Sequence, residues 1–281
     1  METTVRRPLI PLVLLTALLC AGCSSAPEPA PAAARATEEP ATIDSLETDH
    51  GAAVRAAVTK TKRSSARITE EIEVGDGINS FVLSVDGDFD WAADRGRLTV
   101  RLRGEDTPDK TSPRMDEVFR DGTVYVTGLA QLEEGSWGAM PEDELEAHYA
   151  LRAPGNDPRH VLAQIARMRD VAKAGEERVN GVAAVRYRGT LDQEAVTLRM
   201  AQDMREKVDT IRDLTGEVAV DADVWIDARG RIVRTRLDWP LAGASVRATM
   251  DLAKHGLAVE AAAPDEAETV PLSMLGGPLP G

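Results

Sequence analysis

The sequence predicts an α+β fold, a strongly curved antiparallel half-barrel sheet with helices covering the concave face. Beyond residue 65, most apolar residues alternate with polar ones, so each strand has one apolar and one polar side. Turn signals such as Asp121-Gly122 and Asn180-Gly181 join consecutive strands as antiparallel hairpins. A few segments instead show the helical period, each with a single apolar stripe suited to packing on a sheet.

Residues 1–22 are interpreted as a lipoprotein signal peptide. A basic pair precedes an apolar run that ends at Cys23 and is too short to remain as a membrane-spanning helix. The pair Ala21-Gly22 resembles the bacterial lipobox, in which the following cysteine is acylated, although Cys20 stands where the lipobox usually has leucine. We therefore expect Cys23 to be the lipid anchor. The alternatives are a secreted protein cleaved after Ala21 or Gly22, or an uncleaved membrane anchor.

Composition excludes several functional classes. The formal net charge of −14 repels phosphate backbones, so we expect no nucleic-acid partner. Both cysteines precede residue 24, which leaves the folded part without disulfides or cysteine-bound metals. Abundant Arg, Ala, Val, Asp and Gly are typical of a GC-rich genome such as that of an actinobacterium.

The chain divides into four parts. After the signal peptide, residues 23–44 are a Pro/Ala-rich tether with too few large apolar residues to fold. Residues 45–260 form the domain, and residues 261–281 form a loose C-terminal tail. An acylated Cys23 places the protein on the outer face of the cytoplasmic membrane, anchored by its lipid.

Helices are expected over residues 45–62, 158–173 and 194–214. The second begins with an N-cap and a proline at Asp157-Pro158, and Gly216 stops the third. Strands are predicted over residues 68–74, 81–89, 98–102, 115–119, 124–126, 177–180, 183–191, 218–226, 233–239 and 246–252. A closed small barrel has no room for the helices. A two-sheet sandwich is an alternative, but it leaves the helical stripes without a surface to cover.

The order of these elements behind a lipobox resembles the LolA/LolB-like lipoprotein superfamily, and within it the actinobacterial LppX/LprG-type lipoproteins. The resemblance extends over about residues 46–260. The segments that carry it are 124–126, 157–158, 178–181, 187–190 and 224–227 with Gly230. It implies an open half-barrel whose concave side holds acyl chains of lipids, glycolipids or lipoproteins.

The apolar faces of sheet and helices supply candidates for the lining of such a cavity. They are Val100, Leu102, Val126, Val185, Val224, Ile226, Leu237 and Met250 on strands, with Met168, Met204 and Val208 on helices. The same residues could equally fill an ordinary core, because an alternating pattern is the same for a packed and a hollow interior.

No pattern of catalytic residues is present, and we expect neither an enzyme nor a cofactor. Asp86, Asp88 and Asp90 imitate the start of a calcium loop, but Trp91 and Arg97 occupy the positions that need Gly and Glu. The three aspartates are interpreted as the polar side of a strand. The four histidines lack ligand spacing, so no metal site is expected.

The leading functional hypothesis is a lipid-anchored extracytoplasmic protein that binds acyl chains of a lipid or glycolipid, as a carrier or chaperone in cell-envelope lipid trafficking. Its membrane contact is the covalent lipid. The alternative is a non-catalytic structural or regulatory envelope module that binds a partner protein and has a filled core.

Overall fold

The computed structural model describes residues 49–75, 80–104, 113–241 and 243–272. The chain divides into residues 1–47 and residues 48–281, and all described residues belong to the second unit. The expected signal peptide, the tether and Cys23 lie outside the described residues. Within the described ranges, no helix has the length and apolar character needed to cross a bilayer.

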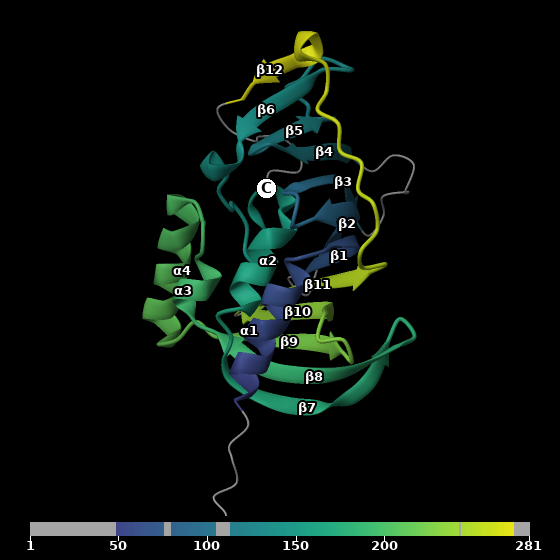
Figure 1. Ribbon diagram of the computed structural model, residues 1–281. Coiled ribbons are helices and arrows are strands. Elements are labelled where there is room, and N and C mark those ends of the chain that lie inside the picture. Colours follow the sequence, from purple (N-terminus) through teal and green to yellow (C-terminus); the bar gives the residue numbers. More distant parts are fainter. Residues whose placement is uncertain (1–48, 76–79, 105–112, 242, 273–281) are drawn as a thin grey trace, which may run out of the picture. The chain divides into compact units, whose positions relative to one another are not determined.

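The described strands form one sheet of twelve (Figure 1). Its spatial order is β12-β6-β5-β4-β3-β2-β1-β11-β10-β9-β8-β7, which leaves β12 and β7 as edges, so the curved sheet is not closed. The bounds are β1 (Ser65–Gly75), β2 (Ser80–Asp90), β3 (Arg95–Gly104), β4 (Arg114–Arg120), β5 (Thr123–Thr127), β6 (Trp137–Pro141), β7 (Arg169–Val179), β8 (Val182–Leu191), β9 (Val220–Asp227), β10 (Ile232–Leu241), β11 (Ala244–Ala253) and β12 (Thr269–Pro271).

Two meanders make up the sheet. One runs from β1 to β6, the other from β7 to β11, and antiparallel pairing of β1 with β11 joins them. All neighbouring strands are antiparallel except β12, which pairs parallel to β6. The single sheet agrees with the predicted half-barrel, and the two-sheet alternative is wrong.

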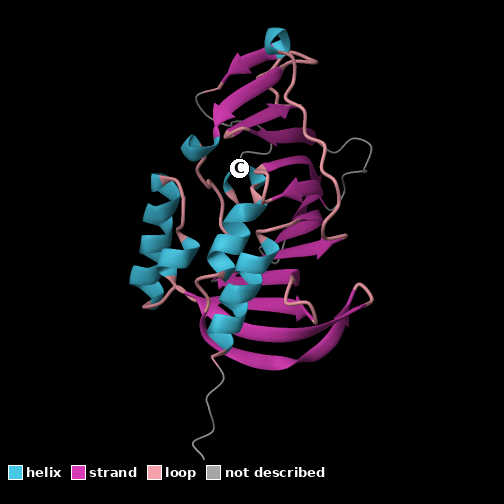
Figure 2. Cartoon of the chain, in the orientation of Figure 1, coloured by secondary structure: helices cyan, strands magenta, loops and turns pink. Residues whose placement is uncertain are grey.

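Helices α1 (His50–Thr61), α2 (Pro158–Ile165), α3 (Gln193–Val196) and α4 (Gln202–Thr215) lie on one side of the sheet (Figure 2). Short 3-10 turns occupy Glu142–Glu144 (η1), Pro154–Asn156 (η2) and Glu266–Glu268 (η3). The Asp49 side chain accepts a hydrogen bond from the Ala52 N–H and so caps α1. Helix α1 lies against α2 and strands β7, β9 and β10, and buries Val54, Ala57 and Val58.

We call the side of the sheet that carries the buried apolar side chains the inner face, and the opposite side the outer face. On β1, Ala66, Ile68 and Ile72 lie on the inner face and are buried. The buried apolar cluster takes side chains from β1–β6, β8–β11 and each of the four α-helices. Burial of this surface is the main favourable term in folding.

The outer face carries ion pairs between neighbouring strands. Examples are Arg67 with Asp88, Arg234 with Asp251, and Arg186 with Asp223. The Arg67–Asp88 pair is the most exposed of the three, whereas Asp223 is buried.

The helix predicted over residues 158–173 is too long. Helix α2 begins as expected at Pro158, with the Asp157 carboxylate accepting from the Arg159 N–H, but it ends at Ile165. Residues 169–179 instead form β7, which is far longer than the strand predicted over residues 177–180. Because β7 is an edge strand with almost all its side chains exposed, and its register shifts twice, it carries no apolar alternation for sequence reasoning to detect.

The third predicted helix is two helices. Asp192 caps α3 by accepting from the Ala195 N–H, and the chain then leaves the helix before α4 starts at Gln202. In between, Arg199 has a positive φ of 52° and Met200 bridges to Ala147. The predicted stop is confirmed, because Gly216 ends α4 in the left-handed conformation with φ 82°.

The remaining predicted strands are confirmed, with bounds that differ by a few residues. Two more strands complete the sheet. Trp137 begins β6, and β12 lies within residues 261–281, the segment predicted as a tail.

The Asn180-Gly181 hairpin joins β7 to β8, and Gly181 has φ 81° with no atom near the position of an added Cβ. Replacing Gly181 by Ala should therefore lower the free energy of unfolding by about 1 kcal/mol through backbone strain alone. Gly181→Asn, which tolerates this conformation, is the matched control and should lose less. Urea denaturation measures the free energy of unfolding of both variants. Equal losses for Gly181→Ala and Gly181→Asn would contradict backbone strain as the cause.

Candidate functional site

Ten of the eleven candidate lining residues belong to the inner-face apolar cluster or pack against it. Val100, Val126, Met168, Val208, Val224, Ile226, Leu237 and Met250 are buried in it, and Leu102 and Met204 lie partly buried against it. Val185 is half-buried and lines a shallow pocket with Ile226 near the β7–β8 hairpin. Met168 lies between α2 and β7 rather than on a helix as predicted.

The register brings several of these side chains together. Val224 on β9 lies opposite Tyr187 on β8, and Leu237 on β10 lies between Ala222 and Ala248 on its two neighbouring strands. These strands therefore present a continuous apolar surface.

Two carboxylates interrupt the inner face. Glu70 lies between Ile68 and Ile72 on β1, and Glu117 follows the same alternation as Met115 and Phe119 on β4. Both are fully buried, with exposed fractions of 2% and 0%. A carboxylate in apolar surroundings is costly unless it is paired or protonated.

The segment before α2 supplies polar neighbours for these carboxylates. Asn156 Nδ2 donates to Glu117 Oε1 at 2.6 Å, and Arg152 Nε donates to Asn156 Oδ1 at 2.9 Å. The Arg152 charge also acts on both Glu70 and Glu117. We call Glu70, Glu117, Arg152 and Asn156 the buried polar cluster.

Burial shifts the protonation of this cluster. Desolvation raises the pKa of Glu70 to about 7, opposed by the Arg152 charge. Desolvation likewise raises the pKa of Glu117 to about 8, opposed by the Asn156 hydrogen bond and Arg152, whereas Asp157 and Asp116 add to the rise. Burial lowers the pKa of Arg152 to about 10, so it stays a cation at neutral pH. Near neutral pH the cluster therefore holds protons that exposed glutamates would have lost.

Sequence reasoning missed these four residues, although the alternation contains a signal for two of them. Glu70 and Glu117 stand at positions of the same parity as their buried apolar neighbours, so each is a charged residue on the apolar side of a strand. Arg152 and Asn156 lie in an irregular segment, where no periodicity indicates burial.

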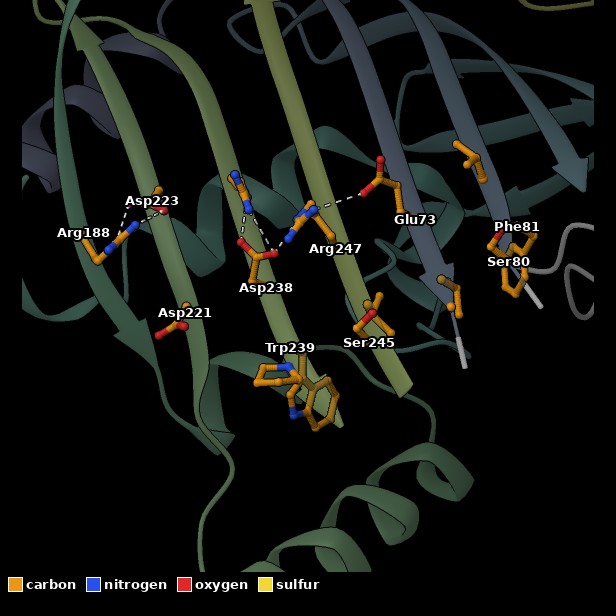
Figure 3. Close-up of a pocket in the computed structure, with 16 residues that line it drawn as sticks. Glu73, Ser80, Phe81, Arg188, Asp221, Asp223, Asp238, Trp239, Ser245 and Arg247 are labelled. Atoms are coloured by element: carbon orange, nitrogen blue, oxygen red, sulfur yellow. Dashed lines mark hydrogen bonds and ion pairs between the residues drawn. The ribbon is translucent and has the colours of Figure 1, made fainter. Parts of the chain in front are cut away.

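A pocket of about 690 Å³ opens at the end of β1, β2, β10 and β11 (Figure 3). Charged side chains lie in a row across its strands: Arg188 contacts Asp223, and Arg247 contacts both Asp238 and Glu73. Trp239 and Phe81 lie farther toward the strand ends. The lining holds three arginines and four carboxylates, so this pocket has a small excess of negative charge.

Two of the three aspartates that imitate a calcium loop have structural partners. Asp88 pairs with Arg67, and Asp90 accepts hydrogen bonds from the backbone N–H groups of Ala92 and Ala93 in the following turn. Across the described ranges, no group of three or more metal-binding side chains occurs. His160 is buried on α2, and desolvation, reinforced by the Arg199 charge, lowers its pKa to about 4.

Comparison with known proteins gives relatives in sequence and in structure. No family model matches the chain. An uncharacterized 31.2 kDa protein of Streptomyces griseus is 24% identical over 159 residues, which cover 54% of this chain and 49% of that protein. The match thus spans about half the length of this curated relative.

Two mycobacterial crystal structures are similar to this chain. LprF from Mycobacterium bovis has a TM-score of 0.47 and 14% identity, covering 76% of this chain and 96% of that chain. The lipoprotein LppX from Mycobacterium tuberculosis has a TM-score of 0.46 and 15% identity, covering 76% of this chain and 98% of that chain.

The raised pKa of Glu117 makes stability depend on pH. Because the folded chain binds this proton more tightly than the unfolded chain does, the stabilisation is complete below about pH 4.5 and is lost as the pH rises toward 8. Glu117→Gln, which can still accept from Asn156, should remove this loss and make the variant more stable than the wild type above pH 8, by on the order of 2 kcal/mol. Urea denaturation across this pH range measures the free energy of unfolding of both proteins. If this free energy changes with pH in the same way for the two proteins, the burial of an ionisable Glu117 is contradicted.

Proposed function

We propose that this is a lipid-anchored extracytoplasmic protein that binds acyl chains of a lipid or glycolipid between its helices and the concave inner face of the sheet. In this role it is a carrier or chaperone in envelope lipid trafficking, held through Cys23 on the outer face of the cytoplasmic membrane. It binds and releases its ligand without covalent chemistry.

The observation that most supports the proposal is the continuity of the inner face. One apolar cluster extends across β1–β6 and β8–β11 of an unclosed sheet. Its methionines adapt to ligands of irregular shape because their side chains are flexible and polarisable. They are Met115, Met140, Met168, Met200 and Met250.

Helix α4 is the element best suited to move aside for a ligand. Of its fourteen residues only Val208 is buried, with Met204 and Ile211 partly buried against the cluster. Each methylene of a chain that replaces these contacts contributes about 0.8 kcal/mol on burial. An acyl chain can therefore displace α4 at low cost.

Val224 lies at the centre of the proposed site and is fully buried on β9. Val224→Trp should fill the space for a ligand and abolish uptake of a fluorescent fatty acid. Val182→Trp is the matched control, since Val182 is 42% exposed on β8, and it should bind like the wild type. Near-UV circular dichroism verifies folding of each variant. Full uptake by a folded Val224→Trp would contradict the proposed site.

Native mass spectrometry of the full protein from its own host tests the ligand directly. An extractable bound lipid supports the proposal. An apo mass under gentle conditions, together with no uptake of fluorescent fatty acids, would instead favour a partner-binding module with a filled core.

Cys23→Ala tests the anchor separately. Without the acylated cysteine the protein should appear in the soluble fraction, because two or three acyl chains are needed for stable attachment. Fractionation followed by a salt wash measures this. Retention of Cys23→Ala in the washed membrane pellet would contradict lipid anchoring at this residue.

A further inference from the structure

The buried polar cluster adjoins the proposed acyl-chain site. Glu70 lies directly opposite Met250 in the pairing of β1 with β11, and Glu117 lies directly opposite Val126 in the pairing of β4 with β5. Side chains opposite each other on one face of an antiparallel pair lie close together. Two carboxylates are thus immediate neighbours of two candidate lining residues.

We propose that Glu70 and Glu117 are a polar subsite that binds hydroxyl groups carried by the buried acyl chain. The ligand class is then a hydroxylated acyl chain rather than an unsubstituted one. This inference rests on the proposed function, because it concerns the same inner-face site.

Each carboxylate has one buried oxygen without a hydrogen-bond partner. Among the described residues, no hydrogen-bond partner lies against Glu70 Oε1 or Glu117 Oε2, although both atoms are buried. Buried polar atoms in folded proteins are rarely left without a partner, and each exception calls for an explanation. A hydroxyl group on the ligand would supply the missing partner at each position.

Arg152 and Asn156 fix this subsite in place. Asn156 engages the other oxygen of Glu117, which orients the carboxyl group and leaves Oε2 for the ligand. The charge of Arg152 balances one ionised carboxylate. The cluster can therefore keep one carboxylate ionised and the other protonated without a net charge in the interior.

A hydroxyl suits this cluster better than a charged group. A hydroxyl both donates and accepts, so it pairs with a carboxyl group in either protonation state. An anionic group would face two carboxylates. An ammonium only donates, and it would require both glutamates to ionise in apolar surroundings.

The test compares neutral ligands that differ only by the hydroxyl. A panel of methyl hydroxystearates, with the hydroxyl at successive positions, and methyl stearate each compete for the full protein against a fluorescent fatty acid. At least one hydroxylated isomer should bind about tenfold to a hundredfold more tightly than methyl stearate, because the unsubstituted chain leaves buried carboxyl oxygens unpaired.

Glu70→Met and Glu117→Met should each reduce this preference. Ile72→Met is the matched control, because it places the same side chain at the next inner-face position of β1 and keeps both carboxylates; its preference should equal that of the wild type. If the glutamate variants do not fold, the preference of the wild type for hydroxylated chains over methyl stearate alone decides whether the subsite exists.

The possible failures are distinguishable. If methyl stearate and every hydroxylated isomer bind the wild type equally, the subsite is wrong and the acyl-chain site stands. The subsite is also overturned if both folded glutamate variants keep the wild-type preference for the hydroxylated chain. It is likewise overturned if an alkylamine of matching chain length binds more tightly than the hydroxylated esters. If no chain binds at all, the proposed function fails, and the subsite fails with it.

Discussion

The pairing of β1 with β11 is the contact on which the rest of the structure depends. It joins two meanders that are far apart in sequence, with Arg67 opposite Ala253 and Gly75 opposite Ser245. Ser65 reinforces it, because its carbonyl accepts from the Gly256 N–H. A shift of one residue would turn every apolar side chain of β1 to the outer face, so burial on the inner face specifies this register strongly.

From that register follows the division of the sheet into two unlike faces. The inner face gains its stability from burial of apolar side chains, a term that does not depend on precise side-chain geometry. The outer face carries ion pairs such as Arg234 with Asp251, whose side chains are partly buried.

The sequence was most informative where strands have one buried side and the turns between them are short. Leu98 and Val100 alternate cleanly with polar residues, and β3 lies where it was expected. The prediction failed where burial is absent, as in β7, whose residues 169–173 are predicted from the sequence as the end of a helix. The prediction of one continuous helix also failed at α3 and α4, because a break at Arg199 leaves the helical spacing of the apolar residues almost intact. For the candidate site, periodicity predicted buried apolar residues such as Val100 but not Arg152, which is buried by tertiary contacts alone.

The exceptions to the alternation carry more functional information than the alternation itself. An apolar residue on the inner face is expected in any folded sheet, so Val100 or Leu237 would be buried in a packed core or beside a ligand alike. A glutamate at such a position has no role in forming a core and lowers stability unless its charge is balanced. Two of them on the inner face, Glu70 and Glu117, both within the field of Arg152, are therefore difficult to explain by folding alone. Natural proteins depart from local rules of this kind chiefly at functional sites. We therefore expect the chemical specificity of the proposed site to come from these polar residues and its affinity to come from the apolar residues around them.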